Sequence, residues 1–486
     1  MKKIYLIGLM GLMALTGGNV VQAQFNETNN IFYHAVRVPQ STMLNPAFFP
    51  ANSSFYLTII PGVDLQFGSP VAINDFIKYD ATRQRTVINL DTMMNNITGD
   101  SKFRINTNVN LLGFGFKAGN TYINFNTRLV NHISVGFPTE MVNALRTGNI
   151  DENGNVRPVV ELLNGDVINA TSYLETALGA AYRFNDLGLT VGVRAKLLFG
   201  VANIQTDNTR IEFHTDPNID SMTARMYYEI QSATFLPYDT IQKKFIFDMG
   251  DVMKNANTGI AFDLGAKYDW GPFSFSLAIN DLTAGIHWKN NVMTWRPEGG
   301  QGNIVFNGVD ITTMLNGGTF SMDSLTSQIE DQLHSMTPTK KDSGDYWFSI
   351  PTKIYLGANY NFGRIFRAGF LFHGQFDRGL LSKSNSLGLD LGDVENTFRW
   401  NTTLSIGMNL YDWLEVIAAN SFVSDNKKFD PINPGIGLIL TPGRFFQIYL
   451  MGDYISDFYL TSSKAISLKV GFNLLFGSGD RSRIDG

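Results

Sequence analysis

Cysteine is absent from this chain of 486 residues, and histidine occurs only six times. The lack of cysteine excludes disulfides, so stability must come from packing and hydrogen bonding. Charged residues make up 17% of the chain, below the usual quarter, whereas aromatic residues reach 13%. Beyond the amino terminus there is no apolar run of about 18 residues, the length that a membrane-spanning helix needs. If this chain enters a membrane, it must therefore cross with strands.

Motifs that carry catalysis are also missing. The sequence has no Gly-x-Ser-x-Gly, no glycine-rich phosphate loop and no His-Glu-x-x-His. His132, His287 and His373 have no spacing that would bring metal or haem ligands together. The net charge is −5, and no basic patch suggests nucleic acid. We expect no enzyme, no metal, no cofactor and no nucleic-acid partner.

The first 23 residues are typical of a secretory signal peptide. Lys2 and Lys3 supply the positive charge, Ile4–Leu15 is apolar, and small residues precede a cleavage site after Ala23. The apolar stretch is too short to span a membrane as a helix. We therefore predict an exported protein whose mature chain starts at residue 24.

The clearest strand pattern is the run Ala465–Phe476 near the carboxyl end. Its apolar residues occupy every second position, and Ser467, Lys469 and Asn473 fall on the other face. Such alternation makes a strand with one apolar and one polar face. The same pattern recurs through most of the chain. In an exported protein it predicts a closed barrel in an outer membrane, with its apolar face against lipid.

Fourteen such segments can be counted, joined alternately by tight turns and long polar connections. Short periplasmic turns and long outer loops are typical of outer-membrane barrels. Two further segments, 210–213 and 222–235, are read as a hairpin in an outer loop; if they cross the membrane, the count becomes sixteen. The fourteen are 54–67, 103–117, 121–137, 172–184, 189–205, 259–270, 273–282, 346–362, 366–377, 397–410, 413–423, 436–441, 445–455 and 465–476.

The prediction is an all-β fold: a transmembrane antiparallel β-barrel of about 14 strands, with residues 51–486 forming one domain. The soluble alternative is a β-sandwich, which would not need an apolar band on so many strands. It would also not need aromatic residues at the strand ends, where interfacial girdles lie. These aromatic residues are Phe137, Phe184, Trp270, Phe362, Trp400 and Phe476.

Residues 24–50, between the signal peptide and the first strand, are too irregular for a strand. Asn45-Pro46 and Phe49-Pro50 break regular structure. A barrel of fourteen strands has a lumen wider than its own side chains can fill. We predict that this segment plugs the lumen and gates passage. A periplasmic tail or a partner-docking peptide is the alternative.

The polar faces of the strands predict the residues that line the lumen. Basic residues outnumber acidic ones on these faces by nine to five, although the whole chain is acidic. Such a field would favour anions, whereas a ladder of mutually neutralising charges is the competing interpretation. The lumen-lining candidates are Arg128, His132, Arg183, Arg194, Lys196, Lys353, Arg367, His373, Arg399 and Lys469.

Two short segments resemble known barrel families. Leu44, Asn45, Pro46, Ala47 and Phe48 resemble the Asn-Pro-Ala segment of FadL-like fatty-acid transporters, and still more the Leu-Asn-Pro-Ala-Phe segment of PorP/SprF-type barrels of Bacteroidota. Residues 54–67, and 279–282 before 286–288, are similar to a related Bacteroidota family of uncharacterised barrels. The resemblance implies a fourteen-stranded barrel plugged by those five residues and their neighbours. It also implies either movement of hydrophobic small molecules or service in type IX secretion.

Two functions follow as hypotheses. The first is passive transport of a small hydrophobic or amphipathic molecule across the outer membrane, gated by the plug. The second is a non-transporting structural or secretion-associated barrel that docks a partner protein on its long loops, 138–171 and 290–345. The expected partners are membrane lipid, the solute, and in the second case an outer-membrane or secretion protein.

Overall fold

The computed structural model describes most of the chain. The predicted signal peptide, Phe137, part of the predicted loop 138–171 and most of the predicted loop 290–345 lie outside the described residues. The described residues are 28–50, 53–70, 72, 77–80, 84–88, 102–136, 141, 153–165, 167–216, 221–234, 238–239, 244–245, 256–297, 302–306, 339–341, 345–376, 398–425, 428–455 and 464–477. Within this part of the chain, no helix has the length and apolar character to span a membrane.

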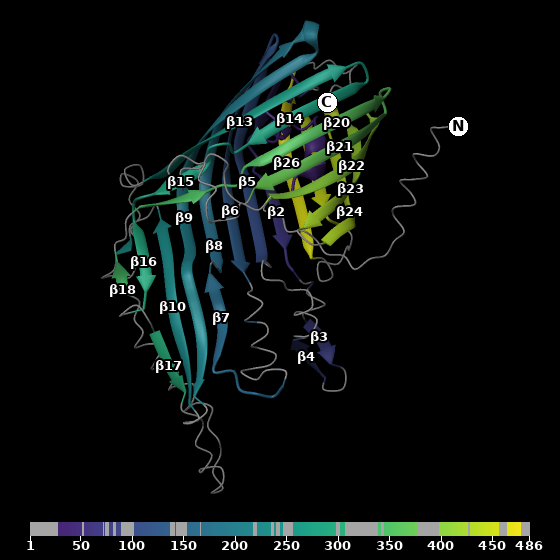
Figure 1. Ribbon diagram of the computed structural model, residues 1–486. Helices are drawn as coiled ribbons and strands as arrows, with labels where there is room; N and C mark the ends of the chain where they lie inside the picture. Colours follow the sequence, from purple (N-terminus) through teal and green to yellow (C-terminus); the bar gives the residue numbers. More distant parts are fainter. Residues whose placement is uncertain are drawn as a thin grey trace.

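The wall is one antiparallel ladder that closes on itself (Figure 1). The first wall strand is β1 (Phe55–Thr58) continued by β2 (Gly62–Gly68), and both pieces pair with the last strand, β26 (Ala465–Phe476). Between them, in order around the barrel, lie β5 (Lys102–Ala118), β6 (Thr121–Gly136), β8 (Ile168–Phe184), β9 (Leu189–Asp216), β13 (Asn257–Trp270), β14 (Phe273–Asn280), β20 (Lys353–Phe362), β21 (Phe366–Phe376), β22 (Phe398–Tyr411), β23 (Leu414–Asp425), β24 (Lys428–Leu440) and β25 (Phe446–Asp453). Fourteen strands close the described wall, which confirms the predicted count.

The alternation of the sequence becomes the two faces of this wall. On β9, Val191 and Val193 are exposed on the outside, whereas Thr190 and Arg194 are buried on the inside. A register shift on β5 between Asn110 and Leu112 is a β-bulge, where the alternation of faces slips by one residue. The exposed large apolar side chains come mostly from the outward positions of the strands, so the exterior suits lipid.

Tight turns join the strands at one end of the barrel. Aromatic side chains surround this end, among them Trp270, Phe362 and Tyr411, each more than half exposed. The turn between β8 and β9 is a short helix, η3 (Asn185–Leu187), that ends at Gly188 with φ +63°. A Cβ at Gly188 would also lie 2.5 Å from the carbonyl oxygen of Asp269, so glycine is required there.

The connections at the other end build a second sheet region beyond the wall (Figure 1). The 28-residue β9 continues past the barrel and pairs there with β10 (Ser221–Thr234) and β7 (Val159–Gly165). Segments 210–213 and 222–235 therefore form an outer hairpin as far as they are described, and the sixteen-stranded alternative is wrong. The same region also contains β16 (Val292–Arg296), β17 (Gly302–Phe306) and β18 (Thr339–Lys341). Two hairpins form sheets of their own: β3 (Ile77–Asp80) with β4 (Arg85–Ile88), and β11 (Tyr238–Asp239) with β12 (Lys244–Phe245).

Two neighbouring wall strands carry irregularities at the same height. β14 gives way to β15 (Gly285–Trp288) through residues 281–284, and β19 (Tyr346–Ser349) precedes β20 across residues 350–352. Asp281 has φ +62°, and its backbone NH donates to Asp263 Oδ1 at 2.9 Å. The predicted strand 346–362 is thus two strands joined by an irregular link.

Replacing Leu178 by arginine tests the lipid-facing exterior. Leu178 is outward on β8 and 59% exposed, so a charge there must be buried in hydrocarbon. The expected cost is about 2–4 kcal/mol of unfolding free energy, measured by denaturant titration in lipid vesicles. Val156→Arg, at an exposed position beyond the wall, is the matched control and should change stability little. Equal effects of the two substitutions would contradict a lipid-facing band.

Candidate functional site

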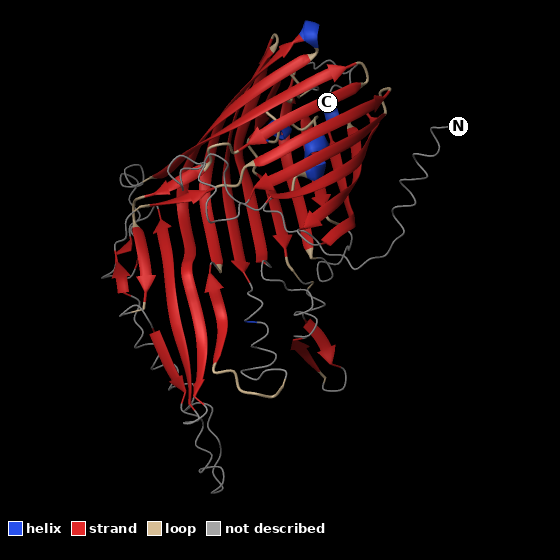
Figure 2. Cartoon of the chain, viewed as in Figure 1, coloured by secondary structure: helices blue, strands red, loops and turns tan. Residues whose placement is uncertain are grey.

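The amino-terminal segment, residues 28–50, lies inside the barrel (Figure 2). It contains a one-turn helix, α2 (Asn30–His34), and a 3-10 helix, η2 (Pro39–Met43), and nearly all of its residues are buried. Since a short irregular segment exposes many backbone groups, its burial requires hydrogen-bond partners from the wall. We call it the luminal segment.

Helix α2 packs against glycines in the wall. Ile31 packs on Gly435, where a Cβ would lie 2.5 Å from its Cδ1 atom, and Tyr33 packs on Gly357, where the corresponding distance is 2.7 Å. The missing side chains leave room for the helix. Because these glycines lie on β24 and β20, the helix is held from separate parts of the wall.

Polar bonds fix the same helix. The Ile31 backbone NH donates to Asp453 Oδ1 at 3.1 Å, and Arg367 donates to the carbonyl oxygen of His34 at 2.6 Å. His34 Nδ1 lies 3.3 Å from Asn359 Oδ1. Burial, reinforced by the charge of Arg367, lowers the pKa of His34 to about 3, so this imidazole is neutral at physiological pH.

The Leu-Asn-Pro-Ala-Phe residues form the second half of the luminal segment. Asn280 donates its amide protons to the carbonyl oxygens of Met43 and Leu44, at 3.2 and 3.0 Å. The Asn45 side-chain oxygen accepts from the Ala47 backbone NH at 2.9 Å, which closes a local turn.

The wall beside this turn is again glycine. A Cβ on Gly192 would overlap the carbonyl of Pro46, and one on Gly265 would overlap the Asn45 side chain. The Asn45 amide also reaches the carbonyl oxygen of Leu277 at 3.3 Å. Residues 44–48, which resemble a motif of other barrels, are therefore the part of the segment that packs against β9, β13 and β14.

The luminal segment covers an apolar part of the wall. Residues of the segment and of six wall strands form one buried cluster. Its members are Ile31, Phe32, Tyr33, Ala35, Val36, Val38, Leu44 and Phe48 from the segment, and Ala278, Tyr355, Leu371, Ile417, Ile439, Tyr449 and Met451 from the wall. Barrel interiors are usually polar, so an apolar lumen wall departs from the common pattern.

The inward positions of β9 show what lies above the segment. Gly192 meets Pro46, the next two inward residues are Arg194 and Lys196, and Leu198 and Gly200 follow. Leu198 belongs to a second buried apolar cluster that includes Trp288, and Trp288 packs on Gly200. The charged layer thus lies between two apolar layers.

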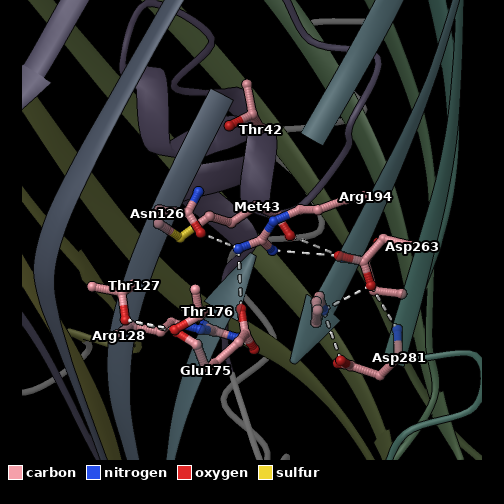
Figure 3. Close-up of polar contacts among 12 residues, drawn as sticks. Thr42, Met43, Asn126, Thr127, Arg128, Glu175, Thr176, Arg194, Asp263 and Asp281 are labelled. Atoms are coloured by element: carbon pink, nitrogen blue, oxygen red, sulfur yellow. Dashed lines mark hydrogen bonds and ion pairs between the residues drawn. The ribbon is translucent and has the colours of Figure 1, made fainter. Parts of the chain in front are cut away.

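This charged layer is a buried ionic network (Figure 3). Figure 3 shows Arg194 between Glu175 and Asp263, at 3.0 and 3.3 Å. Lys196 contacts Asp263 and Asp281, each at 2.7 Å. The network extends through Arg128, 2.8 Å from Glu175, and through Lys353, 3.2 Å from Asp281. Four predicted lumen residues meet here, and three acids from other strands and a turn neutralise much of their charge.

The other predicted lumen residues are spread around the wall. Arg367 pairs with Glu415 at 2.9 Å, Arg183 with Asp269 at 3.4 Å, and Lys469 with Asp64. His132 contacts Asn106, His373 stacks on Tyr355 at 4.5 Å between ring centroids, and Arg399 is half-buried on β22. Arg367, Arg183 and Lys469 are thus each paired with an acid.

Sequence reasoning missed two of these acids. Asp64 lies on the polar face of its strand and could have been found from the alternation. Asp281 lies at the bulge after β14, where strand alternation no longer applies. His287 lies on β15, where it stacks on Trp347 at 4.6 Å and contacts Asp345 at 2.6 Å. Among the described residues, no three histidine or acidic side chains are grouped to hold a metal ion.

Replacing Glu175 by glutamine tests the ionic network. The substitution leaves Arg128 and Arg194 without their shared carboxylate in a buried site, so we expect a loss of about 3–5 kcal/mol of unfolding free energy. The control is Asp412→Asn, which breaks the exposed pair with Arg444 and should cost less than about 1 kcal/mol. Denaturant titration in lipid vesicles measures both. Similar losses would show that burial does not strengthen this network.

The closed ladder and the apolar exterior define a transmembrane β-barrel, with a lumen that holds the chain's own amino-terminal segment. The chain belongs to the family described as "Family of unknown function (DUF5723)", whose model matches residues 46–453. No curated protein matches the sequence. The resemblance to PorP/SprF barrels, the Bacteroidota origin and the signal peptide stay predictions.

Several solved structures share the barrel layout at low similarity. The toluene transporter TbuX of Ralstonia pickettii is 12% identical, with a TM-score of 0.46, over 90% of this chain and 94% of that chain. A FadL homologue of Pseudomonas aeruginosa is 10% identical, with a TM-score of 0.43, over 95% and 100%. The P. putida toluene transporter TodX is 10% identical, with a TM-score of 0.42, over 89% and 91%. At these identities and TM-scores, the similarity does not bear on the function of this chain.

Proposed function

We propose that the protein is an outer-membrane barrel that passively transports a small hydrophobic or amphipathic molecule, and that the luminal segment is its plug. The apolar exterior supports the location, since a bacterial membrane barrel belongs to the outer membrane. The tight turns would face the periplasm and the β9–β10 region the outside. No energy input is invoked, because the plug moves by thermal displacement.

The observation that carries the proposal is the apolar lumen wall beneath the segment. Tyr355, Leu371, Ile417 and Ile439 point inward, where a water-filled pore would carry polar side chains. With the segment in place, these residues are buried core. When the segment moves aside, the same residues form an apolar surface. Contact of this surface with a hydrophobic solute is more favourable than its contact with water.

The charged layer would then determine which solutes pass through the lumen. An amphipathic solute would have to pass Arg194 and Lys196, whose partners Glu175 and Asp263 already neutralise them. A charge ladder of this kind favours neutral or weakly polar solutes over ions. This is why the proposal names hydrophobic and amphipathic molecules and not free anions.

The second candidate is a structural or secretion-associated barrel that docks a partner protein. The specific observation in its favour is the sheet of β7, β9, β10 and β17, which extends beyond the barrel end opposite the tight turns. The many tethers of the luminal segment are compatible with a permanently closed lumen. The two candidates differ in whether displacing the segment opens a path.

Gly192→Ala tests the plug. The added Cβ overlaps the Pro46 carbonyl, and overpacking of this kind costs about 1–3 kcal/mol. The displaced population of the segment should rise by roughly 5- to 150-fold. We expect larger single-channel conductance in planar bilayers, and faster uptake of N-phenyl-1-naphthylamine by cells that carry the protein in the outer membrane.

Gly113→Ala is the matched control. A Cβ at Gly113 meets nothing nearer than 3.5 Å, so this variant should behave like the parent protein. Both variants must first show the folded, heat-modifiable band in gel electrophoresis. If a folded Gly192→Ala protein conducts no more than the parent and takes up the dye no faster, transport through the lumen is refuted and the docking role takes its place.

A further inference from the structure

The ladder is interrupted where the barrel closes. The closing seam is the junction of the first wall strand, β1 and β2, with the last strand, β26. Backbone pairing runs from Phe55 to Leu57 against 474–476, and resumes from Val63 to Gly68 against 465–470. Residues 58–62 and 471–473 have no ladder pairing with each other. We call this interruption of the backbone pairing the gap.

Side chains bridge this gap from the lumen. Gln40 of the luminal segment donates to Thr58 Oγ1 on β1 at 2.8 Å and to Asn473 Oδ1 on β26 at 2.5 Å. Asn473 Nδ2 donates back to Gln40 Oε1 at 2.9 Å, and Thr58 donates to Asn473 at 2.6 Å. All three side chains are buried, with 1–3% exposed. One glutamine therefore bonds to the first and last strands at once.

An aromatic ring packs beside the gap. Gly62 lies close to Gly471 across the seam, and the hydroxyl end of Tyr449 packs over Gly471. Tyr449 in turn contacts Phe32 of the luminal segment, at 5.7 Å between ring centroids. The segment thus supports the gap twice, once by hydrogen bonds and once by packing.

We propose that Gln40 is a clasp that holds the closing seam, so that the luminal segment is required for barrel closure as well as for any gating. The energetic reason is that unpaired backbone in a membrane wall is costly. Buried side-chain bonds that join the two strands offset that cost locally. This role is independent of transport, because it concerns the two ends of the ladder and not a solute path.

Hydrogen–deuterium exchange of the full chain in lipid vesicles tests the clasp. In Gln40→Ala, the amides of 55–57 and 474–476 should exchange roughly tenfold faster, because the three buried hydrogen bonds that join Gln40 to Thr58 and Asn473 are lost. Thr58→Val removes one of these bonds, the one from Gln40, together with the bond from Thr58 to Asn473, and should act in the same direction. The β20–β21 ladder, far from the seam around the barrel, should keep its protection in both variants.

Asn359→Ala is the matched control, since it removes a tether of the luminal segment to β20 and none at the seam. Unchanged seam exchange in Gln40→Ala, or an equal increase in Asn359→Ala, would overturn the clasp. If Gln40→Ala does not fold, Leu57→Cys with Leu474→Cys, a directly paired position in a chain without other cysteines, joins the seam covalently. Folding restored by that disulfide supports the clasp, and folding not restored overturns it.

Discussion

Backbone hydrogen bonding in a medium without water is the constraint from which the rest of this structure follows. A strand in lipid must pair on both edges, so the ladder has to close, and with fourteen strands it encloses more space than its own side chains fill. The luminal segment occupies that space. Its packing on wall glycines, the buried ionic network and the apolar lumen wall are all consequences of filling a barrel of this size.

The interior is organised in layers along the axis. Along β9, Pro46 of the luminal segment packs nearest the tight turn, a charged layer follows, and a second apolar cluster lies beyond it. Buried ion pairs contribute little net stability compared with apolar packing, but they are costly to break and bond only in one arrangement. The charged layer therefore specifies how β8, β9, β13 and β20 face one another.

Glycine has a consistent role in this lumen. At Gly192, Gly357 and Gly435, the absence of a side chain admits part of the luminal segment. The same device at Gly471 admits Tyr449, where the ladder is interrupted. Packing of the luminal segment and packing at the closing seam thus use one physical solution, in which small wall residues let a bulky side chain or backbone approach closely.

The strands, their inward and outward faces and the number fourteen could be read from the sequence, because alternation and turn residues are local and a membrane wall permits no irregular edge. The lumen side of Arg194 and Lys196 was readable for the same reason. Several contacts in the lumen were not readable: Lys196 meets Asp281 on a bulge, Gln40 meets Asn473 across the closed ladder, and Pro46 meets Gly192 from a distant part of the chain. Such contacts depend on register, bulges and closure, which only the tertiary structure decides.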